Sequence, residues 1–472
     1  MSTVVIIGGG PSGLAAAQEV QKRGGQPVVL ERLDIPGGLS RTLRHDDCRY
    51  DIGPHRFFTR NQEVHQLFVD MGGDSIIHVP RLTRIFYGDT FFNYPLTAMN
   101  ALTGMNPTKS AHIMLSYAYA RIKDRVSPQE IKTFEDWVVN RFGRGLFETF
   151  FKTYTEKVWG IGCEEIGADW AAQRIKGLNL LTVIKNALFQ NAQKGQVKTL
   201  VDEFIYPRLG AGQVYENMAD HVSHHGGGVH LQHTTKRIIR DGFKVKALVC
   251  DTPDGEQEIA GDFFLSSAPL TEMLAMFSPE PPPEVLQAAQ SLAYRNHIGV
   301  NLKVEGQLFK DNWIYIHDSR VAMARIANYR NFSPDMSPRA EINPLTVEYF
   351  CFSHDAVWQQ DDRRLIELAT EEMVRIGLIK PNQVVDGFVQ RNAKAYPVIR
   401  KGYQDHIDTI RSWLGQMENL VPIGRSGMFK YNNQDHAMMT GLIGARIAMG
   451  EKQLDPWNVN IDAEYHEGGE AH

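Results

Sequence analysis

The first forty residues constrain the fold of this chain more than any other stretch. Residues 3–7 form an apolar, β-branched run that is typical of a buried parallel strand, and they lead directly into a glycine-rich turn. Residues 14–23 are good helix formers that end at two glycines, and the apolar residues 28–30 then end on Glu31. This order predicts a βαβ unit that binds a dinucleotide: a strand, glycines, a helix, a second strand and an acid.

The glycines of the turn have separate physical roles. Gly8, Gly10 and Gly13 form a GxGxxG pattern: the first permits the tight turn, the second lets a pyrophosphate approach the backbone, and the third lets the helix pack on the strand. We expect the pyrophosphate at the N-terminus of the helix, at Pro11 and Ser12, because the unpaired N–H groups and the helix dipole favour an anion there.

The acid at the end of the second strand is expected to hold the adenosine ribose. Glu31 would accept hydrogen bonds from the ribose hydroxyls and repel a 2′-phosphate, and Arg32 is assigned to the same site. Two alternatives stay open for the unit taken alone. It could be a glycine-rich turn of another kind of α/β protein, and an NAD dehydrogenase fits it as well as an FAD enzyme does.

Length and composition narrow the class of protein. A chain of 472 residues is too long for one ordinary core, so two domains are expected. Hydrophobic residues make up 43% and charged residues 22%, as in soluble globular proteins, and the formal charge of -5 leaves no basic surplus for nucleic acid. No apolar run is long enough to cross a bilayer, and the first apolar segment is itself a strand. We therefore expect a cytoplasmic protein without membrane contact.

Neither the cysteines nor the histidines predict a metal site. The four cysteines form no CxxC pair, so free thiols are expected rather than disulfides or a zinc site. The histidines between 221 and 233 surround a run of three glycines that predicts a helix end and a turn, with no cysteine or carboxylate at ligand spacing. No metal is therefore expected.

A second glycine-rich loop and a Gly-Pro turn follow the dinucleotide unit. Gly37-Gly38 stands shortly before Arg41, and Gly53-Pro54-His55 forms a tight turn among aromatic residues. Two phosphate-friendly loops close together suit FAD better than NAD, because FAD is longer and needs support for its diphosphate, ribityl chain and ring. For His55 alone, a solvent-facing side chain at a strand end is the alternative.

These two loops resemble those of a flavoprotein superfamily. Gly37-Gly38 with Arg41, and residues 53–59, are similar to the FAD loop of the UDP-galactopyranose mutase, protoporphyrinogen oxidase and amine oxidase superfamily. The resemblance implies that His55 lies against the isoalloxazine ring and that the backbone near Thr235 holds the adenine edge. It implies further cofactor contacts at Gly38, Arg41, Gly53 and Pro54. No cysteine or histidine stands in an attachment motif, so the FAD is expected to be non-covalent.

An aromatic block near residue 150 is the first candidate for substrate binding. Tyr154, Lys157 and Trp159 could hold a base, a sugar face or a diphosphate, although core packing is the alternative for such residues. The block resembles the Tyr-Thr-x-Lys-Gln-Trp-Gly segment of the mutases, which implies a substrate-facing wall. Tyr206 and Arg208 could also reach the cleft, but the mobile loop and the first diphosphate-binding arginine of the mutases are not recognisable. That departure favours the oxidase branch.

A second sheet is predicted in the later half of the chain. Residues 296–304, 313–317 and 346–352 alternate as strands do, and they are expected to form the floor of a substrate domain. The side chains assigned there to the substrate are Arg325, Tyr329 and Arg330, with surface or core positions as the alternative. An aromatic strand facing the cleft is predicted to carry Tyr396 and Tyr403.

The last informative stretch predicts a second contact with the cofactor. Residues 419–423, a turn at Gly424-Arg425 and a helix start are typical of an anion-friendly helix end, which would stabilise the negative charge of a reduced flavin. The stretch resembles the closing motif of the superfamily. This resemblance assigns Asn433 and Asp435 to the cofactor and Tyr431 to the substrate.

The predicted fold class is α/β: a Rossmann-type, GR2-like FAD domain interleaved with a substrate domain of mixed sheet and helices. The FAD domain is expected to comprise residues 1–78, 212–275 and 415–455, and the substrate domain residues 79–211 and 276–414. Residues 456–472 are expected to be an acidic, loose tail.

The leading hypothesis is an FAD-dependent oxidoreductase that acts on a sugar or nucleotide sugar, with flavin N5 as hydride acceptor. The residues assigned to the reacting centre are His55, Arg425 and Tyr396. A non-redox UDP-sugar mutase of the galactopyranose type, using reduced FAD, is the alternative. A protoporphyrinogen or amine oxidase, and a flavin-binding scaffold without turnover, are further alternatives. NAD(P)H or another reductant is a further expected partner, and the oligomeric state stays open.

Overall fold

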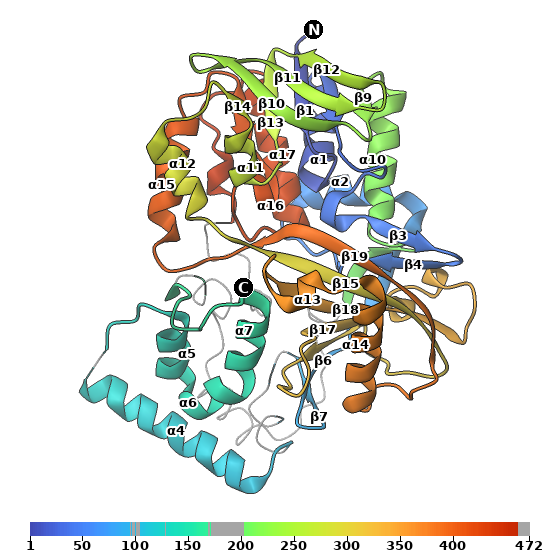
Figure 1. The fold of residues 1–472 in the computed structure, drawn as a ribbon, viewed down its shortest axis with the longest axis vertical. Coiled ribbons are helices and arrows are strands. Elements are labelled where there is room, and N and C mark those ends of the chain that lie inside the picture. The colour runs from blue at the N-terminus through green and yellow to red at the C-terminus, as the bar shows by residue number, and fades with distance from the viewer. Residues whose placement is uncertain are drawn as a thin grey trace.

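The computed structural model describes residues 1–94, 96, 100, 104–127, 129–168, 170 and 203–460. The parts of the predicted substrate domain at 171–202 and of the predicted tail at 461–472 therefore lie outside the described residues. The described chain forms an upper half that contains the N-terminal strand and a lower half built on a large mixed sheet (Figure 1). This is the predicted α/β class, with the two halves interleaved along the sequence.

A five-stranded parallel sheet organises the upper half. Its strand order is β20-β13-β1-β2-β9, so it collects strands from the start, middle and end of the chain. The bounds are β1 Thr3–Ile7, β2 Gln26–Leu30, β9 Gly228–His230, β13 Phe263–Ser266 and β20 Leu420–Pro422. The helices that accompany it are α1 Pro11–Lys22, α2 Gln62–Gly72, α10 Gly212–His224 and α17 Gln434–Ala448.

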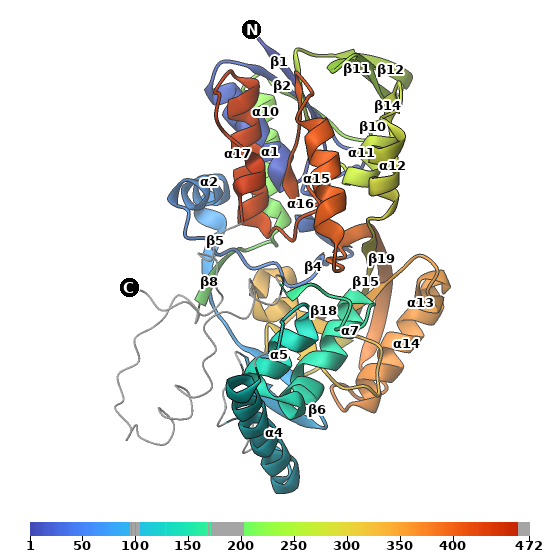
Figure 2. The ribbon, with the colours of Figure 1, turned by 90° about the vertical axis from the view of Figure 1, so that its left-hand side faces the viewer.

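Small residues let α1 pack tightly against its neighbours. Ala15, Ala16 and Ala17 are fully buried, and α1 contacts both α17 and α10 (Figure 2). A Cβ added at Gly441 of α17 would lie 2.0 Å from the Ser12 carbonyl oxygen. The two helices therefore meet at a point where only glycine fits, and this contact fixes the start of α1 against the C-terminal segment.

A smaller sheet and three helices cover one side of this half. The sheet order is β12-β11-β10-β14, and its strands are β10 Thr234–Asp241, β11 Lys244–Thr252, β12 Gly255–Ala260 and β14 Phe277–Ser278. Beside it lie α11 Leu270–Ala275, α12 Pro283–Gln290 and α15 Tyr403–Leu414 (Figures 1 and 2).

The domain boundaries predicted at 275 and 415 differ from this arrangement. They assign α12 and α15 to the substrate domain, whereas both helices pack with the upper half, where Trp413 meets Phe277 edge-on with ring centroids 5.1 Å apart. The prediction of an aromatic strand that includes Tyr403 is wrong, because Tyr403 begins α15 after Gly402, which adopts φ +82°. Strand β19 ends at Pro397, and Gly402, whose positive φ favours glycine, lies immediately before the helix.

A seven-stranded mixed sheet forms the lower half. Its order is β19-β15-β18-β17-β16-β6-β7, and its strands are β6 Thr83–Tyr87, β7 Thr90–Asn93, β15 Tyr294–Glu305, β16 Trp313–Ile316, β17 Arg325–Asn328, β18 Ile342–Cys351 and β19 Val384–Pro397. Helix α14, Asp362–Arg375, buries Leu365, Ala369 and Met373 against it, and the short α13 is Ala356–Gln359. The predicted sheet floor is present, and β15 and β19 run along the boundary between the halves (Figure 1).

A helical layer completes the lower half. It consists of α4 Pro107–Val126, α5 Phe134–Phe142, α6 Arg144–Leu146, the π-helical turn Phe147–Lys152 and α7 Thr153–Trp159. On α4, Leu115, Tyr119, Ile122 and Val126 are exposed and lie on one face, so this helix carries an exposed apolar stripe. None of the described helices is both long and apolar enough to cross a membrane.

Short elements connect the two halves. Hairpin β3–β4 (Thr42–His45 and Cys48–Asp51) follows the 3₁₀ turn Gly38–Ser40, and β5 (Ile76–Pro80) pairs with β8 (Glu203–Pro207). The remaining short turns are Gly73–Ser75, Tyr329–Asn331, Pro334–Met336 and α16 Gly424–Gly427.

The chain stays packed beyond Asp455, where a loose tail is predicted. Residues Pro456–Asn458 form a 3₁₀ turn, and Trp457 is buried. Lys430 Nζ donates hydrogen bonds to the carbonyl oxygens of Trp457 at 2.5 Å and Val459 at 2.9 Å. The prediction of a tail from residue 456 is therefore wrong up to residue 460. The contacts that hold these residues come from Lys430, which the composition of the segment itself does not indicate.

Candidate cofactor and substrate cavity

One cavity of about 1090 Å³ runs from the β1–α1 turn into the lower half. Of the residues predicted to bind the cofactor, those lining it are Gly8, Gly10, Pro11, Ser12, Glu31, Arg32, Gly38, Arg41, Pro54, His55, Thr235, Arg425, Asn433 and Asp435. Of those predicted to bind the substrate, the lining ones are Tyr154, Arg325, Tyr396, Tyr403 and Tyr431. One cavity thus brings together residues that are more than 400 positions apart in sequence.

The glycine turn has the geometry that its sequence predicts. Gly8 adopts φ +100°, and a Cβ at Gly13 would lie 1.9 Å from the Gly8 carbonyl oxygen, so Gly13 serves the packing of helix on strand and does not line the cavity. A Cβ at Gly10 would meet only Gly38, at 3.7 Å. No side chain caps the start of α1. The backbone at Gly10 is therefore open to a ligand at the N-terminus of a helix.

Glu31 is buried at the end of β2 and lines the same end of the cavity. Its Oε2 accepts a hydrogen bond from the Gly9 N–H at 2.7 Å, and its Oε1 accepts one from the Leu33 N–H at 2.9 Å. Each carboxylate oxygen can accept a further hydrogen bond. The two backbone contacts thus fix the carboxylate beside the turn and leave it able to bind a ribose hydroxyl.

Buried polar atoms without partners test whether a flavin dinucleotide fits here. Within the described residues, His55 Nδ1, Arg425 Nη2 and Asp435 Oδ2 are inaccessible to solvent and make no hydrogen bond, although all three residues line the cavity. Buried polar atoms normally find a partner. FAD offers acceptors on its ring and phosphates and hydroxyl donors on its ribityl chain, so the donor and acceptor set fits this cofactor.

Arg425 is held at the boundary between the halves. Its Nε donates to the Ala395 carbonyl oxygen at 3.1 Å, and its guanidinium lies 4.2 Å and 4.3 Å from the ring centroids of Tyr396 and Tyr431. The prediction that a helix dipole at Gly424 faces the cofactor is wrong. The helix that begins there has only four residues, and Gly424 does not line the cavity. The longer helix at this position, α17, begins instead after its cap, Asn433.

His55 lies on the tight turn that precedes Phe57. Burial, together with the positive charge of Arg325, lowers the pKa of His55 to about 3, so its imidazole is neutral near pH 7. Gly53 does not line the cavity but adopts φ +87°, and a Cβ there would lie 3.0 Å from Glu348 Oε2. Glycine at 53 therefore lets the turn rest directly on the Arg325–Glu348 pair.

The far end of the cavity is aromatic. The Tyr154 ring stacks on His317 with centroids 4.7 Å apart and meets Tyr315 edge-on at 5.4 Å. Burial, with Lys157 as a smaller cause, lowers the pKa of His317 to about 3. Sequence reasoning missed the lining residues Arg81, Tyr94, Trp170, His297, Trp313, Tyr315, His317 and Asn392. Strand alternation in 313–317 is the one signal that could have pointed to Tyr315, because it places Trp313, Tyr315 and His317 on one face.

Lys157 and Trp159 do not line the cavity, although a substrate-facing wall was predicted. Lys157 Nζ donates to three carbonyl oxygens, those of Ile316 at 3.3 Å, Asp318 at 2.6 Å and Met323 at 3.1 Å. Trp159 is buried and packs edge-on against Trp170. Of this block, Tyr154 alone among the three assigned side chains reaches the cavity, because α7 turns the other two toward the protein interior.

Tyr206, Arg208 and Tyr329 also lie away from the cavity. The Tyr206 hydroxyl donates to Asp51 Oδ2 at 2.6 Å, and the Tyr329 hydroxyl donates to the Asp51 carbonyl oxygen at 2.6 Å. Both tyrosines are fully buried, whereas Arg208 is exposed beside Asp335 at 3.5 Å. The structure thus places two of the predicted substrate contacts beneath hairpin β3–β4 and the third on the surface.

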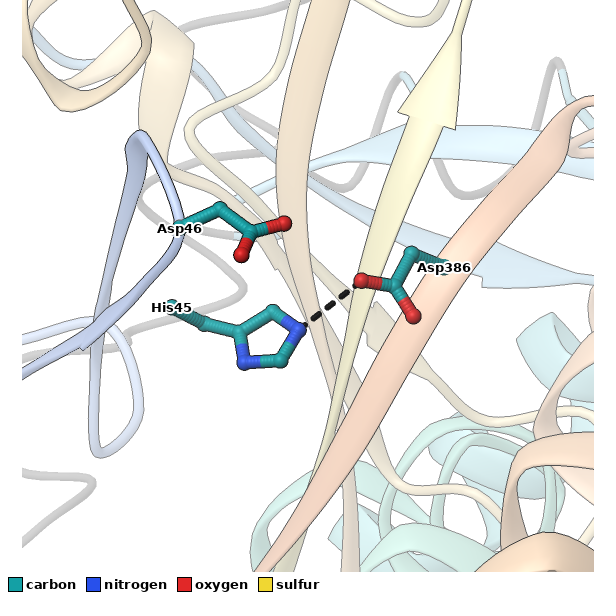
Figure 3. Close-up of side chains that lie close together, drawn as sticks. All are labelled: His45, Asp46 and Asp386. Atoms are coloured by element: carbon teal, nitrogen blue, oxygen red, sulfur yellow. Dashed lines mark hydrogen bonds and ion pairs between the residues drawn. The ribbon is translucent and has the colours of Figure 1, made fainter.

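The donor atoms of His45, Asp46 and Asp386 lie within 4.8 Å of one another, the one such group in the described part of the chain (Figure 3). His45 Nε2 is 2.8 Å from Asp386 Oδ2, and Asp46 Oδ2 is 3.5 Å from Lys303 Nζ. All three residues are partly or fully exposed, and a lysine already pairs with one of them. The group ties hairpin β3–β4 to β19, and we assign no metal to it.

Two curated mutases are similar in sequence to part of this chain. A probable UDP-galactopyranose mutase of Klebsiella pneumoniae is 28% identical over 225 residues, which cover 46% of this chain and 53% of that protein. The dTDP-fucopyranose mutase of Escherichia coli is 28% identical over 174 residues, 36% of this chain and 44% of that protein. The matched stretch spans about half the length of these curated relatives.

Solved structures share the fold over nearly the whole chain. A crystal structure of reduced UDP-galactopyranose mutase superposes with a TM-score of 0.83 at 20% identity, covering 99% of this chain and 100% of that one. Putrescine oxidase bound to putrescine superposes with a TM-score of 0.64 at 14% identity, covering 95% and 99%. The family model for flavin containing amine oxidoreductases matches residues 11–409. The chain therefore belongs to the flavin containing amine oxidoreductase family, and it is an FAD-dependent enzyme.

Proposed function

We propose that this chain binds FAD non-covalently and interconverts two isomers of a nucleotide sugar with reduced FAD, without net redox change. NAD(P)H or another reductant would supply the electrons that keep the flavin reduced. The two curated mutases named above support this proposal better than they support sugar oxidation, which is the leading hypothesis from the sequence. The substrate belongs to the class of small molecules with a sugar and a diphosphate.

The observation that carries the proposal is the continuity of the cavity. Its upper end contains the glycine turn and Glu31, which suit a dinucleotide, and its lining also contains Arg325, which interacts electrostatically with Tyr154 and Tyr396. A buried guanidinium among aromatic rings suits an anionic ligand that carries a base or a sugar. One continuous cavity could therefore hold both a cofactor and a second ligand.

Reduced flavin supplies a nucleophilic nitrogen that can attack the anomeric carbon of a sugar nucleotide. The residues of the chain have to bind, orient and exclude water. His55 and His317 have pKa values of about 3 and stay neutral near pH 7, and burial raises the pKa of Tyr154 well above its usual value. These side chains keep one protonation state during turnover, as positioning groups should.

The deciding experiment compares oxidised with dithionite-reduced enzyme. UDP-galactopyranose and dTDP-fucopyranose are incubated with each form, and the anomeric protons are followed by ¹H NMR while the flavin absorbance is recorded. We expect isomerisation with the reduced enzyme alone and no consumption of reductant. Bleaching of the oxidised flavin by the sugar nucleotide, with peroxide release, would instead establish an oxidase.

A pair of arginine variants tests the site. Arg325→Lys keeps the charge but loses the planar guanidinium, which makes the two-point pairing with Glu348. We therefore expect the KM for the nucleotide sugar to rise at least tenfold. Arg330→Lys is the matched control, because Arg330 donates to the carbonyl oxygens of Ser337 and Arg339 and does not line the cavity. Equal kinetics for the two variants would show that Arg325 does not bind the substrate.

A further inference from the structure

A chain of buried hydrogen bonds crosses the floor of the cavity from Arg41 to Arg325. Arg41 Nη2 donates to Asn392 Oδ1 at 3.0 Å, and Asn392 Nδ2 lies 3.1 Å from His297 Nδ1. His297 Nε2 lies 2.9 Å from Glu348 Oε2, and Glu348 accepts from Arg325 Nε at 2.5 Å and Nη2 at 2.6 Å. Four of the five residues line the cavity, and Glu348 lies behind them.

The inventory of donors and acceptors allows only one arrangement of this chain. Arg41 can only donate, so the Asn392 oxygen must face it and the Asn392 NH₂ must face His297. His297 Nδ1 is then the acceptor, Nε2 carries the hydrogen, and that hydrogen is donated to the carboxylate. Every joint is satisfied with a neutral imidazole, so no member can rotate without leaving a buried polar atom unpaired.

The seven-stranded sheet holds these residues in register. His297 on β15 is directly opposite Asn392 on β19, and Arg325 on β17 is directly opposite Glu348 on β18. Gly299 is the residue opposite Glu348 on β15, and a Cβ there would approach His297 Cε1 to 3.4 Å. The absence of a side chain at 299 leaves the space through which His297 reaches Glu348 diagonally.

The two ends of the chain serve the two ends of the cavity. Arg41 is buried, and its Nη1 donates to the Gly38 carbonyl oxygen at 2.5 Å, so it fixes the second glycine loop opposite Gly10. Arg325 lies at the aromatic end with Tyr154 and Tyr396. A shift of either guanidinium changes the hydrogen bonds of the residues between them.

We propose that His297 and Asn392 are positioning residues that couple cofactor binding at Arg41 to substrate binding at Arg325. This inference rests on the proposed function, because it takes FAD as the ligand at the Arg41 end and a nucleotide sugar at the other. Coupling between two sites is reciprocal, so each ligand strengthens the binding of the other by the same factor. A factor of about five is expected, at the lower end of the usual range for coupled sites.

The test titrates FAD into flavin-stripped protein with and without saturating UDP as the probe, following flavin fluorescence. In the native chain, UDP should tighten FAD binding about fivefold. Asn392→Leu should abolish this effect, and His297→Gln, which breaks the next joint, should do the same. Asn301→Leu is the control. Asn301 is a buried polar residue on β15, like His297, but it pairs with Thr346 outside the chain of hydrogen bonds.

A second measurement needs no substrate. Glu348 does not line the cavity, yet Glu348→Gln should weaken FAD binding several-fold in the native background and not in the Asn392→Leu background. Thermal unfolding of every variant identifies any that does not fold. If Asn392→Leu does not fold, the measurement is made in the His297→Gln background instead.

The outcomes separate the coupling from the function. Additive effects of Glu348→Gln and Asn392→Leu on FAD binding, or a UDP effect that survives Asn392→Leu, would overturn the coupling and leave the function intact. If native protein binds FAD but not UDP, the substrate assignment fails, and the substrate-free measurement still decides the coupling. If native protein does not bind FAD, the proposed function and the coupling fail together.

Discussion

Arg325 and Glu348 form a two-point ion pair beneath the Gly53 turn, with N–O distances of 2.5 and 2.6 Å. Burial alone would raise the pKa of Glu348, but Arg325 and His297 outweigh it and lower that pKa to about 2. The carboxylate therefore stays ionised while fully buried. The pair supports the Gly53 turn from below, and Arg325 lines the cavity.

Breaking this pair should cost considerably more stability than breaking a surface pair. Glu348→Gln leaves the Arg325 charge buried without its counter-ion, so we expect the free energy of unfolding to fall by about 3 kcal/mol. Glu367→Gln is the matched control, because it breaks only the exposed pairs of Glu367 with Arg363 and Arg364, and the loss of unfolding free energy should stay below about 1 kcal/mol. Urea unfolding measures both. Equal losses would show that burial of the Arg325–Glu348 pair does not matter.

The buried histidines should make the protein sensitive to acid. His317 has a pKa of about 3 in the folded chain and about 6.5 when unfolded, so between these values the unfolded state binds one more proton. Stability from this group is therefore complete above pH 6.5 and is lost as the pH falls toward 3. In His317→Phe, which can keep the stacking on Tyr154, unfolding free energy should depend less steeply on pH, by up to about 1.4 kcal/mol per pH unit.

The comparison of the two pH profiles isolates one residue. His55 and Asp51 also titrate in this range, with pKa values of about 3 and about 6, but they are present in both proteins. Identical slopes for native protein and His317→Phe, measured by urea unfolding from pH 4 to pH 7, would mean that His317 is solvated or already charged.

Lys157 should prove structural rather than substrate-binding. Lys157→Met removes the donor for three carbonyl oxygens, so we expect the unfolding free energy to fall by about 2 kcal/mol. The dissociation constant for UDP should change less than twofold, because Lys157 does not line the cavity. Lys152→Met, on the exposed side of the same helical block, is the control for stability. A large loss of UDP affinity at constant stability would instead support the prediction that Lys157 faces the substrate.

Local patterns predicted the β1–α1–β2 unit well because its parts are neighbours in sequence. The strand, glycines and helix of residues 3–23 determine one another's positions within a single βαβ unit. The aromatic and charged substrate residues behaved differently. Lys157 and Tyr206 carry side chains of the right chemistry, but their partners, Ile316 and Asp51, lie 159 and 155 residues away.

The coupling residues could not be found from sequence for the same reason. His297 and Asn392 stand in ordinary strands, and nothing near them in sequence indicates that they face each other across β15 and β19. Register between distant strands decides which side chains meet, and a shift of one residue would turn both away. Tyr403 shows the converse, since α15 begins immediately after Gly402, where the aromatic pattern suggested a strand.

Substitutions at Gly10 and Gly13 should separate cofactor binding from folding. A side chain at Gly13 would collide with the Gly8 backbone at 1.9 Å, so Gly13→Ala should lower the melting temperature and also lose flavin. Gly10 has φ −83° and ψ −174°, which any residue adopts, and a Cβ there meets only Gly38 at 3.7 Å. Gly10→Val should therefore leave the unfolding of the flavin-free protein nearly unchanged, yet weaken FAD binding on the order of a hundredfold, because its side chain occupies the path of the pyrophosphate. The measurements are the ratio of flavin to protein absorbance and the melting temperature of stripped protein. Retention of flavin by Gly10→Val would place the pyrophosphate away from the start of α1.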